Sequence, residues 1–290
     1  MKIKAFIYIV IAGILWGTAG IFVHFLSPFG FSSLQMTAIR GTVAAIAMSV
    51  YVFFTNRQAF KIRIIDLLLF ACSGFFLFGT SSCYYIAMQA SSVSTAVILM
   101  YTSPVIVMAF SVFFFGEKIN RLKIFSVICM LAGCALVSGI IGGMELNVLG
   151  IIMGLAASLA YSAYNVFTKI QMRRLCNPKS ATLFCLIFMA LVALCFSNPP
   201  EIVSIMTQNV AVILPLSLGL GICTCVLPYF LYTLALKDLP VGTAAALGIV
   251  EPMSATIFSI VLLGESLSIP SLCGISLILI AVLLLSRSKN

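Results

Sequence analysis

Two ionisable residues stand inside long apolar stretches of this sequence. Arg40 lies about seven residues from the start of one stretch, and Glu251 lies near the middle of another. If these stretches cross a bilayer, each charge costs about 2.5–3.5 kcal/mol at the centre, so each needs a partner or a hydrated site. In one hypothesis, Arg40 attracts an anionic group and Glu251 accepts a proton or an amine. In the other, both are structural, and each is neutralised by the other or by backbone carbonyls.

Other polar and aromatic side chains occupy the same apolar stretches. Polar groups that face lipid are costly, so these side chains should turn towards a cavity or a neighbouring helix. Asn165 and Tyr161 lie four residues apart and therefore share one helical face. Hydrogen bonding and packing between helices would explain any single residue, but the whole set favours an aromatic-lined cavity. The candidate substrate-binding residues are Trp16, Arg40, Tyr84, Tyr101, Tyr161, Asn165, Tyr232 and Glu251.

Motifs for catalysis or metal binding are missing from the sequence. It has no GxxxxGK[ST] loop for ATP and no HExxH zinc motif, and its single histidine is His24. The ten cysteines lie mostly within apolar stretches and show no zinc-site spacing. We therefore expect no enzyme activity, no catalytic residues, no cofactor and no metal.

The composition identifies the environment of these residues. Of 290 residues, 62% are apolar and 8% are charged, whereas soluble domains are roughly 45–50% apolar and about 25% charged. This excess excludes a soluble enzyme. The net charge of +9 comes from short basic clusters between apolar stretches, so nucleic acid is not an expected partner. The expected partner is the lipid bilayer.

The apolar stretches predict an all-α polytopic membrane protein with ten transmembrane helices. Each stretch is close to the roughly 20 residues that a spanning helix needs, and Gly, Pro, Ser or charged residues separate them. The predicted spans are 5–26, 33–54, 65–88, 93–115, 124–141, 148–168, 180–197, 210–234, 242–263 and 271–286.

The basic residues predict the orientation. With the N-terminus in the cytoplasm, every Lys and Arg except Arg40 falls in a cytoplasmic segment, including Lys289. The outer loops hold no basic residue but contain Glu145, Glu201 and Glu265. This arrangement follows the positive-inside rule. It predicts a multi-pass protein of the cell (plasma or inner) membrane, with both termini cytoplasmic.

The two halves of the sequence resemble each other at a shift of 148 residues. STAVILMYTSPVIVMAFSVFFFGE (94–117) aligns with GTAAALGIVEPMSATIFSIVLLGE (242–265), and a weaker match at a shift of 145 aligns 15–22 with 160–167. The aligned spans point in opposite directions. Chance similarity of apolar helices is the alternative, but prolines, glycines and glutamates coincide. We therefore expect two inverted five-helix repeats, 1–141 and 148–286, which are typical of transporters.

Pro104 and Pro252 occupy equivalent mid-span positions in this alignment. A proline inside a helix frees a carbonyl and permits a kink, so both are candidate hinge or gating residues. The pairs Gly13/Gly17 and Gly150/Gly154 predict close helix packing. Lys169 is expected to extend to the cytoplasmic surface.

These segments resemble a known family. GILWGTAGIF, YYIAMQASSVSTAVIL and YTLALKDLPVGTAAALGIVEPMSATIFSIVLLGESLS are similar to the two EamA-type repeats of the drug/metabolite transporter (DMT) superfamily. The resemblance implies a ten-helix fold with a central cavity between helices 1–4 and 6–9, and peripheral helices 5 and 10. It implies transport of amino acids, other metabolites or drugs. Two departures are Arg40, which has no basic counterpart in the second half, and Tyr161, which replaces Trp16 there.

The expected function is therefore secondary transport of a small metabolite, an amino acid or a drug, by alternating access around the central cavity. The expected direction, efflux, rests on the resemblance alone. A small molecule such as an amino acid is the expected partner, with a proton and a second copy of the chain in a homodimer as further options. The alternative is a membrane protein that does not transport, either an enzyme on lipid substrates or a channel-like subunit.

Overall fold

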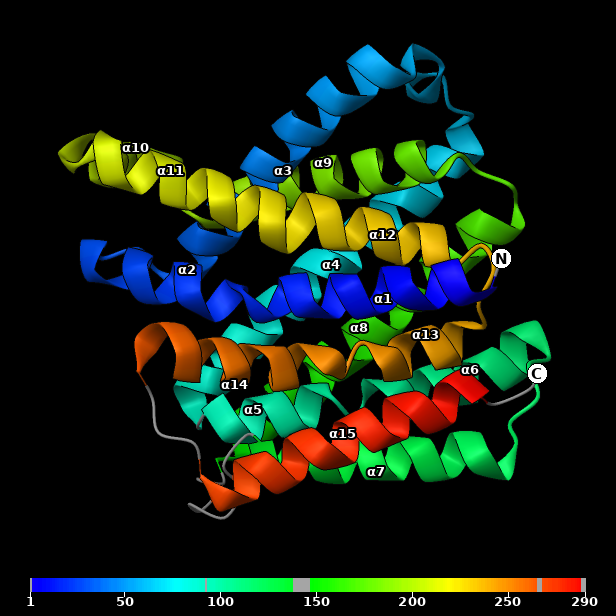
Figure 1. Cartoon of the computed structure of the whole chain (residues 1–290). Helices are drawn as coiled ribbons and strands as arrows, with labels where there is room; N and C mark the ends of the chain where they lie inside the picture. Colours follow the sequence, from blue (N-terminus) through cyan, green and yellow to red (C-terminus); the bar gives the residue numbers. More distant parts are fainter. Residues whose placement is uncertain (1, 92, 138–146, 265–267, 288–290) are drawn as a thin grey trace.

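The structure is a computed structural model that describes residues 2–91, 93–137, 147–264 and 268–287, and every regular element in these ranges is helical (Figure 1). The elements of the first half are α1 (Lys2–Gly17), α2 (Ala19–Leu26), η1 (Ser27–Phe29), α3 (Ser33–Thr55), η2 (Arg57–Phe60), α4 (Ile64–Ala90), α5 (Val93–Met100), α6 (Ser103–Phe115) and α7 (Arg121–Val137). Those of the second half are α8 (Val148–Arg173), α9 (Pro178–Phe196), α10 (Pro199–Gln208), α11 (Val210–Gly221), the π-helix η4 (Ile222–Val226), α12 (Leu227–Ala235), α13 (Val241–Leu247), α14 (Val250–Leu263) and α15 (Ile269–Arg287).

Within the described ranges, eight helical stretches are long and apolar enough to cross a membrane. The protein is therefore a multi-span membrane protein. Helices occur at all ten expected positions, but α7 and α15 are not among these eight stretches, and they pack against each other at one edge of the molecule (Figure 1). Glu145, Glu265 and Lys289 lie outside the described residues.

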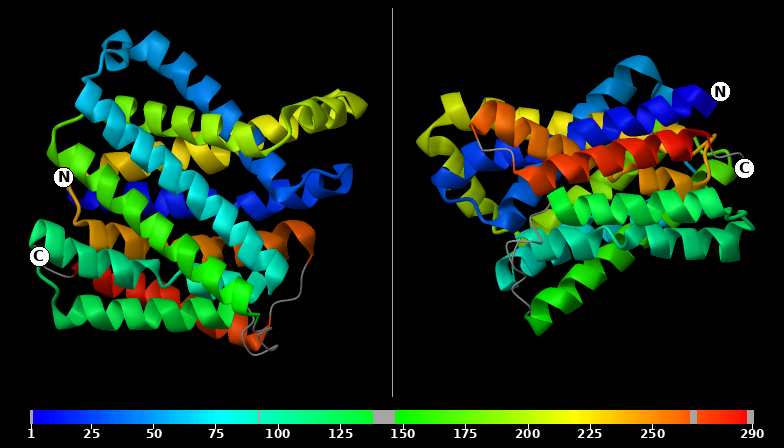
Figure 2. Two further views of the ribbon diagram at one scale, coloured as in Figure 1. Left: turned by 180° about the vertical axis from the view of Figure 1, so that it is seen from behind. Right: turned by 60° about the horizontal axis from the view of Figure 1, so that its bottom comes forward.

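Helix α1 runs through the middle of the molecule, between α12 and α14 (Figure 1). Seen from behind, α4 and α8 lie side by side and cross the whole layer (Figure 2). The start of α1 and the connections 56–63, 116–120, 174–177 and 236–240 lie on one side, which we call the N-terminal face. The opposite face carries η1 and α10.

Helix α10 was not expected from the sequence, which predicted a loop between residues 197 and 210. It begins with Pro199 and Pro200, which suit the first turn of a helix. Its buried residues Ile202 and Ile205 pack with Leu26 and Ile213 in a small apolar cluster at the opposite face. A polar segment with only a few apolar residues thus forms a helix because those residues share one side.

The expected kinks before Pro104 and Pro252 are two-residue interruptions of the helix. Helix α5 ends at Met100 before α6 begins, and α13 ends at Leu247 before α14 begins. Pro104 is the second residue of α6, and Pro252 is the third residue of α14. A proline there removes a backbone donor where helices lack partners anyway. The two interrupted spans are therefore built alike.

The predicted close packing at small residues is confirmed. A Cβ added to Gly17 would lie 2.7 Å from Ser254 Cβ and 2.8 Å from Ala255 N, and one added to Gly154 would lie 2.7 Å from Leu99 Cβ. These distances are shorter than a van der Waals contact, so α1 approaches α14 almost backbone to backbone.

We predict that Gly17→Ala destabilises the protein, because its new methyl group has no space and overpacking costs about 1–3 kcal/mol. Thermal unfolding in detergent should show a lower Tm. Gly20→Ala, three residues later in the same span, is the matched control, because no atom lies within 4 Å of its added Cβ. Equal Tm values for the two variants would contradict this packing.

Candidate functional site

A cavity of about 100 Å³ lies in the middle of the molecule, where α1, α3, α4, α8, α12 and α14 meet. It contains five of the eight residues predicted to bind substrate, and the others lie close behind its wall. The lining residues are Trp16, Ala19, Arg40, Thr80, Ser81, Tyr84, Tyr85, Met100, Tyr161, Thr224, Tyr229 and Glu251.

The cavity brings the two intramembrane charges to one space. Arg40 is half-buried, seven residues or about 10 Å along α3 from its start, and its Nη2 donates a hydrogen bond to Ser81 Oγ at 3.3 Å. Glu251 is half-buried at the second position of α14. Among the described residues, the ion pairs within 4.0 Å all involve Asp66, so Arg40 and Glu251 do not neutralise each other by direct contact.

Several hydrogen-bonding groups at the cavity are buried without a partner. Among the described residues these include Trp16 Nε1, Arg40 Nε and Tyr101 OH. The Tyr101 hydroxyl lies near the Glu251 carboxyl but does not meet hydrogen-bond geometry. Unsatisfied buried donors are costly. Their gathering around one cavity therefore fits a site that binds acceptor groups.

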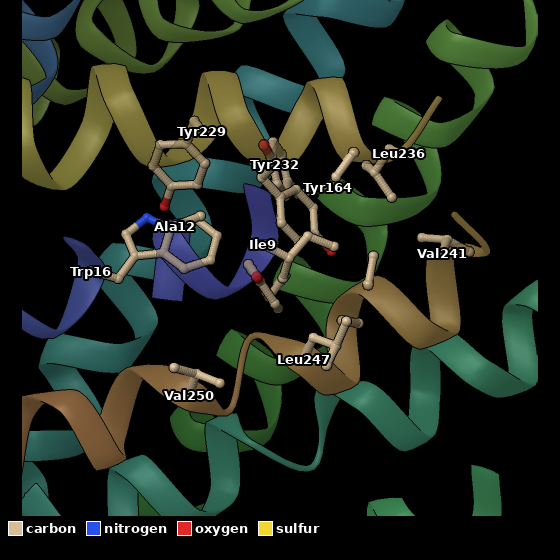
Figure 3. Packing of buried hydrophobic residues seen from close by; sticks show 14 of the residues in the cluster. Ile9, Ala12, Trp16, Tyr164, Tyr229, Tyr232, Leu236, Val241, Leu247 and Val250 are labelled. Carbon is tan, nitrogen blue, oxygen red and sulfur yellow. The ribbon is translucent and has the colours of Figure 1, made fainter. Parts of the chain in front are cut away.

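Aromatic rings pack together beside the cavity, and two of them, Trp16 and Tyr229, also line it (Figure 3). The ring centroid of Trp16 lies 5.2 Å from that of Tyr229 and 5.6 Å from that of Tyr232, and Tyr229 lies 5.7 Å from Tyr164. These edge-on and tilted contacts join α1, α8 and α12. The rings hold Trp16 in place, so its indole N–H has a fixed direction.

Three predicted site residues, Tyr101, Asn165 and Tyr232, do not line the cavity, and the last two bond to each other. Tyr232 donates its hydroxyl hydrogen to Asn165 Oδ1, and Asn165 Nδ2 donates to the backbone carbonyl of Tyr161 at 2.7 Å. Both side chains are fully buried. Because their polar groups are paired, they fit the packing hypothesis and support Tyr161 from behind.

The breaks in two spans position the acidic and phenolic groups. Tyr101 stands in the break between α5 and α6, and Glu251 follows the break between α13 and α14. Interrupted helices at mid-membrane expose backbone and side-chain groups that a continuous helix would hide, and such breaks are typical of substrate sites in transporters. Pro104 and Pro252 follow these breaks and do not line the cavity.

Seven lining residues were not among the candidates, and five of these are polar: Thr80, Ser81, Tyr85, Thr224 and Tyr229. Thr80 and Ser81 are small polar residues in an apolar helix, and such residues usually bond to their own backbone, as Thr80 Oγ1 does to Phe76 O at 2.8 Å. Tyr85 and Tyr229 carried the same signal as the chosen tyrosines. Among the described residues, no group of three or more His, Cys, Asp or Glu could hold a metal ion.

Comparisons with known proteins match nearly the whole chain. The profile of the EamA-like transporter family matches residues 3–139 and 148–287. The uncharacterized transporter YwfM of Bacillus subtilis (strain 168) is 24% identical over 98% of this chain and 94% of its own, and an uncharacterized transporter of Clostridium kluyveri is 26% identical over 96% and 91%. A crystal structure with 19% identity matches with a TM-score of 0.80, covering 98% of this chain and 96% of the other, and so shares the fold. The chain belongs to the EamA-like transporter family of the drug/metabolite transporter superfamily and is a membrane transporter.

Proposed function

We propose that this transporter exports small zwitterionic metabolites, amino acids above all, across the cell membrane by alternating access. The observation that carries the proposal is the pair of opposite charges on the wall of one small cavity. Arg40 provides planar donors that suit a carboxylate, and Glu251 provides an acceptor that suits an ammonium group. An α-amino acid carries both groups.

The size of the cavity supports a small substrate. Pockets for drug-sized ligands are about 300–1,000 Å³, whereas this cavity measures about 100 Å³. The unpaired Trp16 Nε1 and Arg40 Nε add donors for further acceptor atoms. We therefore favour amino acids over drugs, with transfer of a proton at Glu251 as a second use of that carboxyl.

The alternating-access part of the proposal rests on inverted repeats, 1–141 and 148–286, with ten spans and cytoplasmic termini. Matching helices begin at nearly constant separations: α3 and α9 start 145 residues apart, α5 and α13 start 148 apart, and α7 and α15 start 148 apart. The family profile matches twice, once in each half. Two similar halves around one cavity support a mechanism in which the halves move against each other.

Uptake and counterflow of a panel of labelled amino acids in proteoliposomes test the proposal. Saturable exchange of at least one amino acid is expected. The proposal is wrong if the panel shows no exchange while the protein is folded and inserted.

Replacing Arg40 by Gln should raise the KM for a transported amino acid roughly tenfold to a hundredfold, since hydrogen bonds to charged groups contribute about 1.5–3 kcal/mol. The KM for the decarboxylated amine, which lacks the anionic group, should change little. Arg57→Gln is the control, because Arg57 is exposed and its guanidinium lies over the Phe53 ring. A KM that rises equally for acid and amine would contradict a carboxylate contact.

Replacing Glu251 by Gln preserves size but removes the charge. Transport of a zwitterionic amino acid should fall at least tenfold, and the pH dependence of the remaining activity should disappear. Glu201→Gln is the control, because Glu201 is exposed at the opposite face and bonds to Asn198. An unchanged rate with unchanged pH dependence would remove Glu251 from both the proton and the amine roles.

Replacing Pro104 by Ala restores a backbone N–H and favours a continuous helix through the break between α5 and α6. If the break is a hinge, the maximal exchange rate should fall several-fold with little change in KM. Pro28→Ala, in the 3-10 turn η1, is the control. Exchange by Pro104→Ala at the wild-type rate would exclude the hinge role.

A further inference from the structure

A second polar site lies between the cavity and the N-terminal face, and it is closed. It is a seam between α8, α9 and α12 that leaves a cavity volume of about 0 Å³, less than a water molecule needs. The seam shares Tyr229 with the central cavity. Its polar lining residues are Tyr164, Thr168, Gln171, Thr182, Cys185, Tyr229 and Thr233.

The seam contains polar groups that its closed form does not satisfy. Gln171 Nε2 donates to Leu69 O at 2.9 Å and to Ser73 Oγ at 2.6 Å, but Gln171 Oε1 and Thr182 Oγ1 are buried without a hydrogen-bond partner. Buried acceptors and hydroxyls without partners are unfavourable. Both groups would gain water if the seam opened.

The seam and the central cavity use corresponding positions of the two halves. At a separation of 145 residues, Ala19 and Arg40 of the cavity correspond to Tyr164 and Cys185 of the seam. At a separation of 148, Ser81 and Tyr85 correspond to Tyr229 and Thr233. The central cavity is open, with a volume of about 100 Å³, and the seam is closed, with a volume of about 0 Å³.

At the N-terminal face, a buried lysine holds the helices of the seam together. Lys169 on α8 is 8% exposed, and its Nζ donates to Leu236 O at 2.7 Å and to Leu239 O at 2.6 Å. These carbonyls follow the C-terminal end of α12, where a positive charge is favourable. The expectation that Lys169 extends to the surface is therefore wrong. Separating α12 from α8 would break both hydrogen bonds.

The N-terminal face has a cavity of its own near the seam. A larger cavity of about 290 Å³ lies between η2, the start of α4 and the 174–177 connection. Ser180 lines this cavity, and the adjacent Ala181 and Thr182 line the seam. The closed seam therefore shares Tyr229 with the central cavity and borders the same turn of α9 as this surface cavity.

We propose that the seam between α8, α9 and α12 is the part of the translocation path that leads to the N-terminal face, and that Lys169 holds it closed in this structure. This inference rests on the proposed alternating access but not on the substrate class. When the seam opens, Thr168, Gln171, Thr182 and Thr233 line the path. The central cavity closes its Ala19–Arg40 side in the same movement.

The native thiol of Cys185 reports on the seam, because it is buried and lines the closed space. The unaltered protein in proteoliposomes is treated with a membrane-impermeant, cationic methanethiosulfonate reagent on one face or the other, and modification of Cys185 is followed by peptide mass spectrometry. We expect slow modification only from the N-terminal face. Modification from the opposite face, or from neither face, would overturn the proposal without requiring any variant to fold.

In the Lys169→Met variant, the reagent should modify Cys185 at least tenfold faster from the N-terminal face. In Lys169→Arg, which keeps hydrogen-bond donors, the modification rate should stay near that of the wild type. Lys179→Met is the matched control, because Lys179 donates to Thr55 Oγ1 at 2.8 Å and not to α12. An unchanged rate in folded Lys169→Met would remove the lysine's role. Because this assay contains no substrate, failed amino acid exchange with the expected labelling would contradict only the substrate class.

Discussion

The lack of hydrogen-bond partners in the bilayer interior is the constraint behind this structure. Lipid tails cannot satisfy a carboxylate, a guanidinium or a free backbone group, so each must be paired or face a polar space inside the protein. Most of the chain meets this constraint with apolar helices whose backbones bond to themselves. Arg40, Glu251 and the interruptions before α6 and α14 are places where the chain departs from that solution, and they lie at or beside the central cavity.

Close backbone packing makes these departures tolerable. Gly17 lies against Ser254 and the Glu251 carbonyl, so α1 supports α14 directly after its break. The aromatic contacts of Trp16 with Tyr229 and Tyr232 connect the same helix to α12. Helix α1 thus supports the walls of the cavity on α12 and α14. The hydrogen bond between Tyr232 and Asn165 supports the wall on α8.

Much of the fold could be predicted because hydrophobic length and basic flanks are properties of single segments. The approximate positions of the helices follow from these two properties, and the choice of Arg40 and Glu251 as candidate site residues follows from the cost of placing a charge in lipid. The tertiary contacts could not be predicted in this way. Nothing in the sequence distinguishes Tyr229, which lines the cavity, from Tyr232, which is paired behind it. Lys169 resembles any basic residue at the end of a span, yet the carbonyls of a distant connection surround it.

Under the proposed alternating access, the correspondence between Arg40 and Cys185 would have a kinetic consequence. A carrier in which Arg40 borders one access path and Cys185 borders the other would hold an anionic group more strongly on the arginine side than on the thiol side. Its half-saturation concentrations would then differ between the two membrane faces. The equilibrium distribution of the substrate would not differ, because it depends only on the gradients across the membrane. Unequal halves can therefore make the transport rates in the two directions differ at a given concentration, while the gradients across the membrane determine the final substrate distribution.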